Sequence, residues 1–116
     1  MIGQTYGVVH DGTFIFGVLF KWINKKEELS KGLAKESSAL LKQRWAGQIS
    51  RLVGHLHERG IIWGDVKAEN VLIDKNDDAW IIDFGGSYTP GWVDKEKAGT
   101  LEGDKQGLAK IMDILS

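Results

Sequence analysis

The sequence predicts a small domain of the α+β class. Two β-rich runs, residues 5–9 and 13–20, flank His10-Asp11-Gly12, and Asp-Gly between such runs is a strong signal for a β-hairpin. Residues 37–59 carry apolar side chains at three- and four-residue spacing, which is typical of an amphipathic helix. Shorter apolar runs and a second amphipathic segment follow. Together these elements give the α+β class.

The central helix has clear signals at both ends. Ser37 or Ser38 can cap its start, and Gly60 can end it in the left-handed conformation. Gly47 and Gly54 lie inside it, and we interpret both as positions of close packing rather than as breaks. Its apolar stripe consists of Leu41, Trp45, Ile49, Leu52, Val53 and Leu56.

The remaining elements are short. In chain order we expect a short helix at 27–33, a buried strand at 61–63, a loop at 64–70, strands at 71–73 and 80–82, and a final helix at 103–115. The polar residues 74–78 between the last two strands are expected to form a solvated turn. The five tryptophans lie on apolar faces, which favours packing in the core.

Length and composition exclude several classes of protein. With 116 residues the chain has room for one domain, and its net charge of −1 argues against a nucleic-acid or membrane partner held by charge. The absence of cysteine excludes disulfides, iron–sulfur clusters, thiol nucleophiles and cysteine-based zinc sites. No apolar run is long enough to span a bilayer and no signal peptide is recognisable. We therefore expect an intracellular, cytoplasmic protein of unknown oligomeric state.

The second predicted hairpin brings two polar side chains together. If Ile73 pairs with Trp80, the next opposed pair at the open end is Asn70 with Asp83. Directly opposed residues have Cβ atoms about 5 Å apart on one face of the sheet. Mg²⁺ is held by a few protein oxygens and completed by water and phosphate. This register would therefore give one cation site.

The loop that leads into this hairpin carries two further charged residues. Asp65 and Lys67 can approach Asn70 only if the loop is turned, which Gly64 makes easier. A carboxylate that accepts a hydroxyl proton, an ammonium group and a metal site in one place are suited to phosphoryl transfer. Positioning and charge neutralisation carry most of the catalysis of that reaction.

Around these residues the sequence resembles the protein kinase family of Ser/Thr type. Residues 63–70, W-G-D-V-K-A-E-N, resemble the catalytic loop H-R-D-L-K-P-E-N, and residues 83–85 match the metal-binding D-F-G motif. Residues 56–61, L-H-E-R-G-I, resemble the end of the preceding helix. The similarity runs from about residue 41 to 84, and residues 85–94 resemble kinase-like proteins of filamentous fungi.

The resemblance implies a role for each matching residue. Asp65 would be the catalytic base for the substrate hydroxyl, and Lys67 would hold the γ-phosphate of ATP. Asn70 and Asp83 would bind Mg²⁺. The hinge backbone that meets adenine would consist of Phe20, Lys21, Trp22 and Ile23.

The chain departs from the family pattern in several places. It has no G-x-G-x-x-G loop, no V-A-I-K lysine and no A-P-E motif, and Trp63 and Gly64 replace the usual histidine and arginine of the catalytic loop. The resemblance implies a single truncated domain over residues 1–116, in which 1–24 form the end of the N-lobe with the hinge and 25–116 a partial C-lobe. This partial protein-kinase-like fold is less than half of a normal kinase domain.

Three functions remain open from the sequence. The first is ATP- and Mg²⁺-dependent phosphoryl transfer to a Ser/Thr hydroxyl of a protein, weak in this truncated chain. The second is a pseudokinase or fragment that acts as a nucleotide-binding or interaction module. The third is a small-molecule phosphotransferase of the aminoglycoside or choline kinase type, in which G-D also replaces R-D, although Lys67 and Glu69 favour the protein kinase.

Two residues outside the motifs are expected to support the catalytic loop. Asp104, at the start of the last helix, would brace the loop. Thr100 would form a hydrogen bond with Asp65 across the site.

Overall fold

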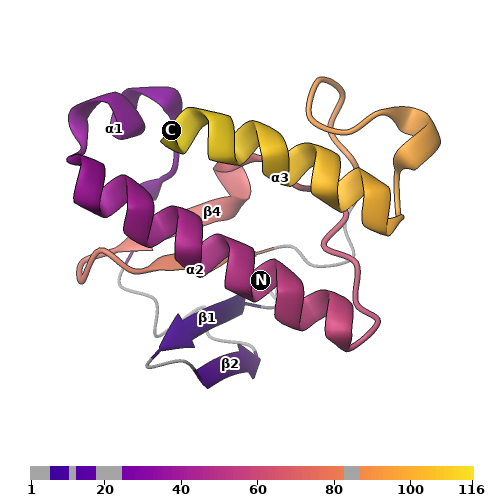
Figure 1. The fold of residues 1–116 in the computed structure, drawn as a ribbon, viewed down its shortest axis with the longest axis horizontal. Coiled ribbons are helices and arrows are strands. Elements are labelled where there is room, and N and C mark those ends of the chain that lie inside the picture. Colours follow the sequence, from indigo (N-terminus) through magenta and orange to yellow (C-terminus); the bar gives the residue numbers. More distant parts are fainter. Residues whose placement is uncertain (1–5, 11–12, 18–24, 83–86) are drawn as a thin grey trace.

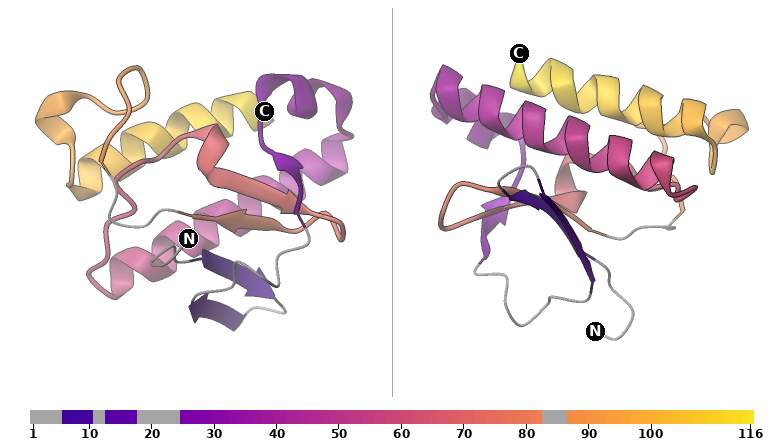
Figure 2. Two further views of the ribbon diagram at one scale, coloured as in Figure 1. Left: turned by 180° about the vertical axis from the view of Figure 1, so that it is seen from behind. Right: turned by 60° about the horizontal axis from the view of Figure 1, so that its bottom comes forward.

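The fold is a five-stranded antiparallel sheet with helices packed on one face (Figure 1). The computed structural model describes residues 6–10, 13–17, 25–82 and 87–116. The long helices α2 and α3 lie side by side over the sheet (Figure 2). The elements are β1 (Tyr6–His10), β2 (Thr13–Gly17), β3 (Lys25–Glu28), α1 (Lys31–Glu36), α2 (Ala39–Glu58), β4 (Val71–Asp74), β5 (Ala79–Ile81) and α3 (Leu101–Leu115). The α+β prediction is confirmed.

The sheet has the strand order β2-β1-β5-β4-β3. The predicted first hairpin is confirmed, because Tyr6 pairs with Gly17 and His10 with Thr13. Strand β1 joins the second hairpin through the pair Gly7 and Ile81. The division of the chain into 1–24 and 25–116 stays a prediction.

The segment before α2 differs from the predicted helix at 27–33. Its first part is strand β3, which pairs with β4 and continues as a backbone hydrogen bond of 2.8 Å from Leu29 N to Val71 O. Helix α1 begins only after Ser30, whose side chain accepts from Leu33 N at 3.0 Å. Pairing with β4, which a local pattern cannot show, overrides the weak helical tendency of this segment.

Helix α2 has the predicted extent and caps. Ser38 is the N-cap and accepts from Leu41 N at 3.2 Å, and Gly60 has a φ of 73°. The predicted stripe faces the core, where Trp45, Ile49, Leu52, Val53 and Leu56 are buried. Gly54, however, is exposed, and a Cβ added there would have no atom within 4 Å, so its prediction as a close-packing residue is wrong.

The predicted register of the β4–β5 hairpin is wrong by one residue. Val71 pairs with Ile81, Leu72 with Trp80 and Ile73 with Ala79. Because side chains alternate across a strand, this shift moves the large Trp80 off the core face and places Ala79 there. Leu72, Trp80 and Ile82 instead form a separate apolar cluster, while Val71, Ile73, Ala79 and Ile81 belong to the main core.

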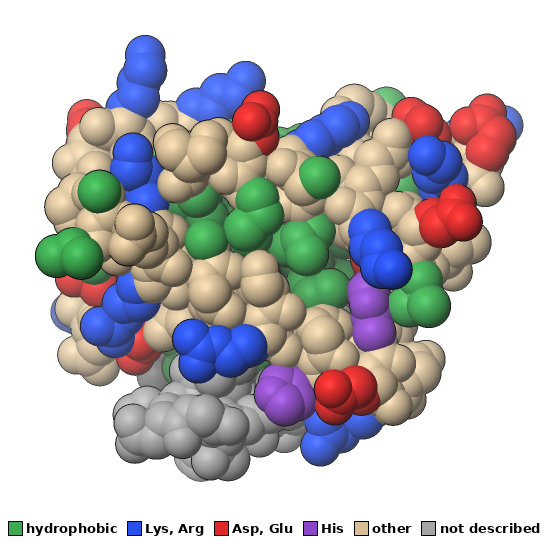
Figure 3. Space-filling view, in the orientation of Figure 1, with side chains coloured by type: hydrophobic (Ala, Val, Ile, Leu, Met, Phe, Trp, Pro, Cys, Tyr) green, Lys and Arg blue, Asp and Glu red, His purple; other side chains and the backbone are tan. Residues whose placement is uncertain are grey.

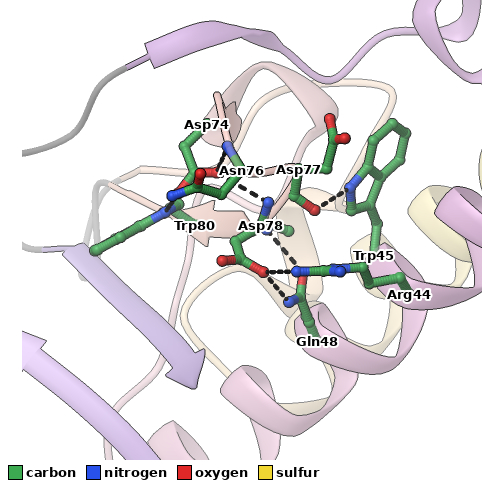
Figure 4. Close-up of polar contacts among 9 residues, drawn as sticks. Arg44, Trp45, Gln48, Asp74, Asn76, Asp77, Asp78 and Trp80 are labelled. Atoms are coloured by element: carbon green, nitrogen blue, oxygen red, sulfur yellow. Dashed lines mark hydrogen bonds and ion pairs between the residues drawn. The ribbon is translucent and has the colours of Figure 1, made fainter. Parts of the chain in front are cut away.

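The β4–β5 turn explains this register. Asp74 is 7% exposed, and its Oδ1 accepts from the backbone N–H groups of Asn76 at 2.8 Å and Asp78 at 3.0 Å. Its Oδ2 accepts from Trp80 Nε1 at 2.8 Å (Figure 4). Asp77 has a φ of 61°, a left-handed conformation that Asp tolerates in turns. The turn chemistry therefore fixes which residues face each other, and the prediction of a solvated turn is wrong for Asp74.

Helix α2 holds the same turn from outside the sheet. Gln48 donates from Nε2 to Asp78 Oδ1 at 2.8 Å and accepts at Oε1 from Ala79 N at 2.8 Å. Arg44 forms an ion pair with the same Asp78 oxygen, and this hydrogen bond raises the pKa of Arg44 (Figure 4). The hairpin is therefore tied to α2 at its closed end.

The prediction that the tryptophans pack in the core is confirmed for Trp45 and Trp63. Trp45 and Trp63 are fully buried, and each donates its Nε1 to a backbone carbonyl at 2.9 Å, Trp45 to Asp77 and Trp63 to Ile82. Trp80 and Trp92 are partly buried against apolar clusters, and Trp22 lies outside the described residues. In the described part of the chain no helix is long and apolar enough to cross a membrane.

Candidate active site

The loop between α2 and β4 alternates buried and accessible side chains. Gly64 turns the chain with a φ of 85°, and Asp65 N donates to Trp63 O at 3.1 Å. The predicted strand at 61–63 is not formed, since this segment has no regular pairing. Val66 is fully buried, whereas the side chains of Asp65 and Lys67 are 18% and 24% exposed. The loop therefore presents a carboxylate and an ammonium group on its accessible side.

Three of the predicted site residues meet at Asp65. The Nζ of Lys67 lies 3.7 Å from Asp65 Oδ2, and Asn70 Nδ2 donates to the main-chain carbonyl of Asp65 at 2.9 Å. Asn70 is 5% exposed and ends the 3₁₀ turn Ala68–Asn70, which lets one short loop bring all three residues together. The loop is therefore turned, as the sequence predicts.

Thr89 is the fourth residue at Asp65, and the sequence gives no indication of it. Its Oγ1 donates to Asp65 Oδ1 at 2.6 Å across a separation of 24 residues. The prediction that Thr100 makes this contact is wrong, because Thr100 instead caps α3: its Oγ1 donates to Lys97 O at 2.7 Å and accepts from Gly103 N at 3.1 Å. The sequence before Gly103 has the ordinary N-cap pattern, and that signal could have excluded Thr100.

Asp104 braces the loop, as predicted. It is 1% exposed, and its Oδ2 accepts from Trp63 N at 2.7 Å while its Oδ1 accepts from Gly64 N at 2.9 Å. Oδ2 also lies 2.8 Å from His57 Nε2, in the last turn of α2. One carboxylate therefore joins α3, α2 and the loop immediately before Asp65.

A glycine of α3 lets this helix touch the loop directly. A Cβ on Gly107 would lie 2.6 Å from Val66 Cβ and 3.0 Å from Val66 O. No side chain fits there unless the loop moves. Val66 stands between Asp65 and Lys67 in the chain, so the position of α3 sets the position of both.

The observed hairpin register contradicts the predicted pairing of Asn70 with Asp83, whereas the cation site itself stays a prediction. Ile82 N donates to Asn70 O at 3.0 Å, so Ile82 and not Asp83 is the residue that meets Asn70. Asp83 itself lies outside the described residues, as do the predicted adenine-contacting residues Phe20, Lys21, Trp22 and Ile23.

Of the two predicted cation ligands, the structure describes Asn70. No group of three or more His, Cys, Asp or Glu side chains gathers within the described ranges. Asn70 donates through its amide nitrogen to Asp65 O, which directs the amide so that its oxygen is the group left to bind a cation. Mg²⁺ uses few protein oxygens and keeps its water, and this donor set is compatible with that preference.

Sequence comparison gives the family of this domain. The protein kinase domain profile matches residues 2–102. The chain therefore belongs to the protein kinase domain family, and its α+β architecture is a partial fold of that kind.

Three curated relatives are named as protein kinases, and two of them as serine/threonine-protein kinases. The chain is 41% identical over 59 residues to serine/threonine-protein kinase kin-29 of Caenorhabditis elegans, covering 51% of this chain and 7% of the relative. It is 45% identical over 64 residues to serine/threonine-protein kinase PKH3 of Eremothecium gossypii, covering 55% and 8%. It is 35% identical over 98 residues to CBL-interacting protein kinase 12 of Oryza sativa, covering 82% and 17%.

The matches cover only a small part of each relative, from 7% to 17% of its length in these three. Similarity alone therefore does not assign the activity and substrates of these longer proteins to this chain. No solved structure matches the chain.

Proposed function

We propose that this chain transfers the γ-phosphoryl group of Mg²⁺-ATP to a Ser or Thr hydroxyl of a protein. The observation that carries the proposal is the arrangement at Asp65, whose two carboxylate oxygens face Thr89 Oγ1 at 2.6 Å and Lys67 Nζ at 3.7 Å. Serine/threonine-protein kinases among the relatives support the same choice of acceptor.

Each described residue of the loop has a distinct task in this proposal. Asp65 accepts the proton of the attacking hydroxyl, and the hydrogen bond from Thr89 holds its carboxylate in one orientation. Lys67 offsets negative charge on the transferred group, and its ion pair with Asp65 keeps it beside the acceptor. Mg²⁺-ATP, when bound, supplies the phosphoryl group and an ion that neutralises its oxygens, with Asn70 and Asp83 as the ligands.

We expect turnover to be low. An active kinase needs a lysine–glutamate pair in its N-lobe together with the metal-bound D-F-G aspartate. Residues 1–116 include neither the V-A-I-K lysine nor a glycine-rich phosphate loop. The residues around Asp65 can position the acceptor, but those two motifs are the ones that position the donor.

Transfer of radiolabelled phosphate to a generic protein substrate tests the proposal. Wild-type protein should label the substrate at a low rate, and Asp65→Asn should abolish labelling because an amide cannot accept the proton. Asp94→Asn is the matched control, since Asp94 is exposed and lies outside the loop. Equal labelling by wild type and Asp65→Asn would contradict the role of Asp65.

The second candidate is a pseudokinase or fragment that serves as a nucleotide-binding or interaction module. The sequence departures in the phosphate-covering parts favour it. A thermal-shift series with ATP, with and without Mg²⁺, separates the two cases, because ligand at 100 times its Kd stabilises the folded state by about 2.7 kcal/mol. A clear shift without phosphoryl transfer would support the module, and no shift at millimolar ATP would leave only an interaction role.

The third candidate is a small-molecule phosphotransferase of the aminoglycoside or choline kinase type. Gly64, in place of the arginine of the usual catalytic loop, favours it, whereas Lys67 and Glu69 match the protein kinases. A comparison of hydroxylated small molecules with peptides as acceptors decides between them. Preferential labelling of the small molecules would overturn the choice of a protein substrate.

A further inference from the structure

Two hollows adjoin each other between α1, the C-terminal part of α3 and the segment after Thr89. The first has a volume of about 290 Å³ and the second about 340 Å³. Lys31, Asp113 and Ile114 line both, so the two hollows are adjacent, and we call them together the groove. The lining does not include Asp65, and nothing in the phosphoryl-transfer geometry uses the groove.

The groove concentrates positive charge in a chain whose net charge is only −1. Its lining includes four lysines and one aspartate, and Lys and Arg side chains gather visibly over α1 and the adjoining end of α3 (Figure 3). The five charged residues are Lys31, Lys35, Lys42, Lys110 and Asp113.

These lysines repel one another, and Asp113 is the carboxylate among the residues that line the groove. Lys31 and Lys35 are four residues apart on α1, a spacing at which like charges destabilise a helix. Among the described ion pairs none involves Lys31, Lys35 or Lys42. Lys110 donates to the carbonyl of Gly91 and so remains a cation without a carboxylate partner in this part of the chain. An anionic ligand would relieve this repulsion.

The walls of the groove are partly apolar. Ala34 is buried at 2% exposure in the first hollow, and Ile114 and Trp92 are partly buried against the core. A small inorganic anion would use only the lysines. A peptide with acidic and apolar side chains would use both kinds of surface, and two adjacent hollows can accommodate a segment of several residues.

The groove begins next to the candidate active site. Pro90, Gly91 and Trp92 line the second hollow and directly follow Thr89, which donates to Asp65 Oδ1. A polypeptide bound along the groove would therefore reach the neighbourhood of the catalytic carboxylate. We propose that this groove binds an acidic segment of the protein substrate, an inference that rests on the proposed phosphoryl transfer to protein.

Fluorescence anisotropy with labelled peptides tests the groove without measuring catalysis. The probe is a peptide of alternating Glu and Leu with one Ser, and its counterpart carries Gln in place of every Glu. Wild-type protein should bind the Glu peptide, lose affinity as salt is raised, and bind the Gln peptide weakly. No binding of the Glu peptide, or equal binding of both, would overturn the proposal.

Variants locate the binding. Lys31→Ala combined with Lys35→Ala should weaken binding about tenfold, the effect of two exposed ion pairs, and should fold because Ala favours helices. Lys75→Ala with Lys95→Ala is the matched control at exposed lysines outside the groove and should leave the affinity unchanged. Asp113→Asn should strengthen binding, since it removes the one aspartate of the lining. Equal losses in both double variants would contradict the location.

The two proposals fail separately. Asp65→Asn should bind the Glu peptide like wild type, because the groove does not include Asp65. If phosphate labelling is absent while the peptide still binds at the groove lysines, the phosphoryl transfer fails and the acidic-segment site stands. If labelling occurs without peptide binding, the groove proposal alone is wrong.

Discussion

The strongest prediction concerns the buried carboxylate of Asp104. Asp104→Ala removes the acceptor of three donors: the backbone N–H groups of Trp63 and Gly64 and the Nε2 of His57. Trp63 and Gly64 are both buried, so water cannot replace the lost partner. An unsatisfied buried donor costs about 1–3 kcal/mol, and two of them give an expected loss of about 4 kcal/mol.

A second variant keeps the shape of the side chain and removes one of its two acceptor oxygens. Asp104→Asn retains one oxygen, but its amide NH₂ must face one of the N–H groups that the carboxylate accepted. We expect about half the loss, about 2 kcal/mol, since one donor stays satisfied. This variant should fold even if Asp104→Ala does not, because small domains have a total stability of about 5–15 kcal/mol.

Urea unfolding followed by tryptophan fluorescence measures both variants. Trp45 and Trp63 are both fully buried, so tryptophan emission changes when the core unfolds. Asp113→Ala is the control, because Asp113 is an exposed aspartate of the same helix and should change stability by less than about 0.5 kcal/mol. A loss below about 1 kcal/mol for Asp104→Ala would refute the assigned role of the carboxylate as the brace of the loop.

Three further predictions follow from single contacts. Gly107→Ala should lower the free energy of unfolding in urea by about 1–3 kcal/mol, because the new Cβ would displace Val66. The same displacement should lower the rate of any phosphoryl transfer. An unchanged free energy of unfolding would show that the loop moves without cost. Gly54→Ala should raise the free energy of unfolding by about 1 kcal/mol, because the position is exposed, lies in a helix and has no atom near the new Cβ. A lower Tm would contradict this. Gln48→Leu should cost about 1–3 kcal/mol in the same urea assay, since the buried Ala79 N–H loses its acceptor, whereas Gln43→Leu, at an exposed position of the same helix, should have little effect.

The register of the β4–β5 hairpin is the clearest case in which a sequence pattern is insufficient. Val71–Ile73 and residues 80–82 are both apolar runs, so either of two neighbouring registers buries hydrophobic side chains. The choice depends on where Asp74 directs its two oxygens and on which residue of β5 is small enough to lie beside Gln48. These are contacts among side chains of three elements, and an alternation pattern along one strand cannot contain them.

In the candidate active site, too, some features can be predicted from the sequence and others cannot. The turn at Gly64 can be predicted because it depends on residues within a short loop, whereas the position of Asp65 and Lys67 also depends on the contact of α3 with Val66. The sequence also indicates Asp104 as the brace of that loop, but it gives no sign of Thr89, whose contact with Asp65 spans 24 residues and comes from a segment without regular structure. The contact of Gly107 with Val66 has no signal beyond a glycine in a helix.

The amino-acid order alone determined the α+β class, the caps of α2 at Ser38 and Gly60, and the loop that carries Asp65 and Lys67. These features depend on periodicity, capping and turn geometry, whose energies arise between near neighbours in the chain. The tertiary structure decided the pairing of β3 with β4, the side of the sheet on which Trp80 lies, and the group that orients Asp65. Each of those outcomes is a competition between partners distant in sequence, which is settled only when the core and its buried hydrogen bonds form together.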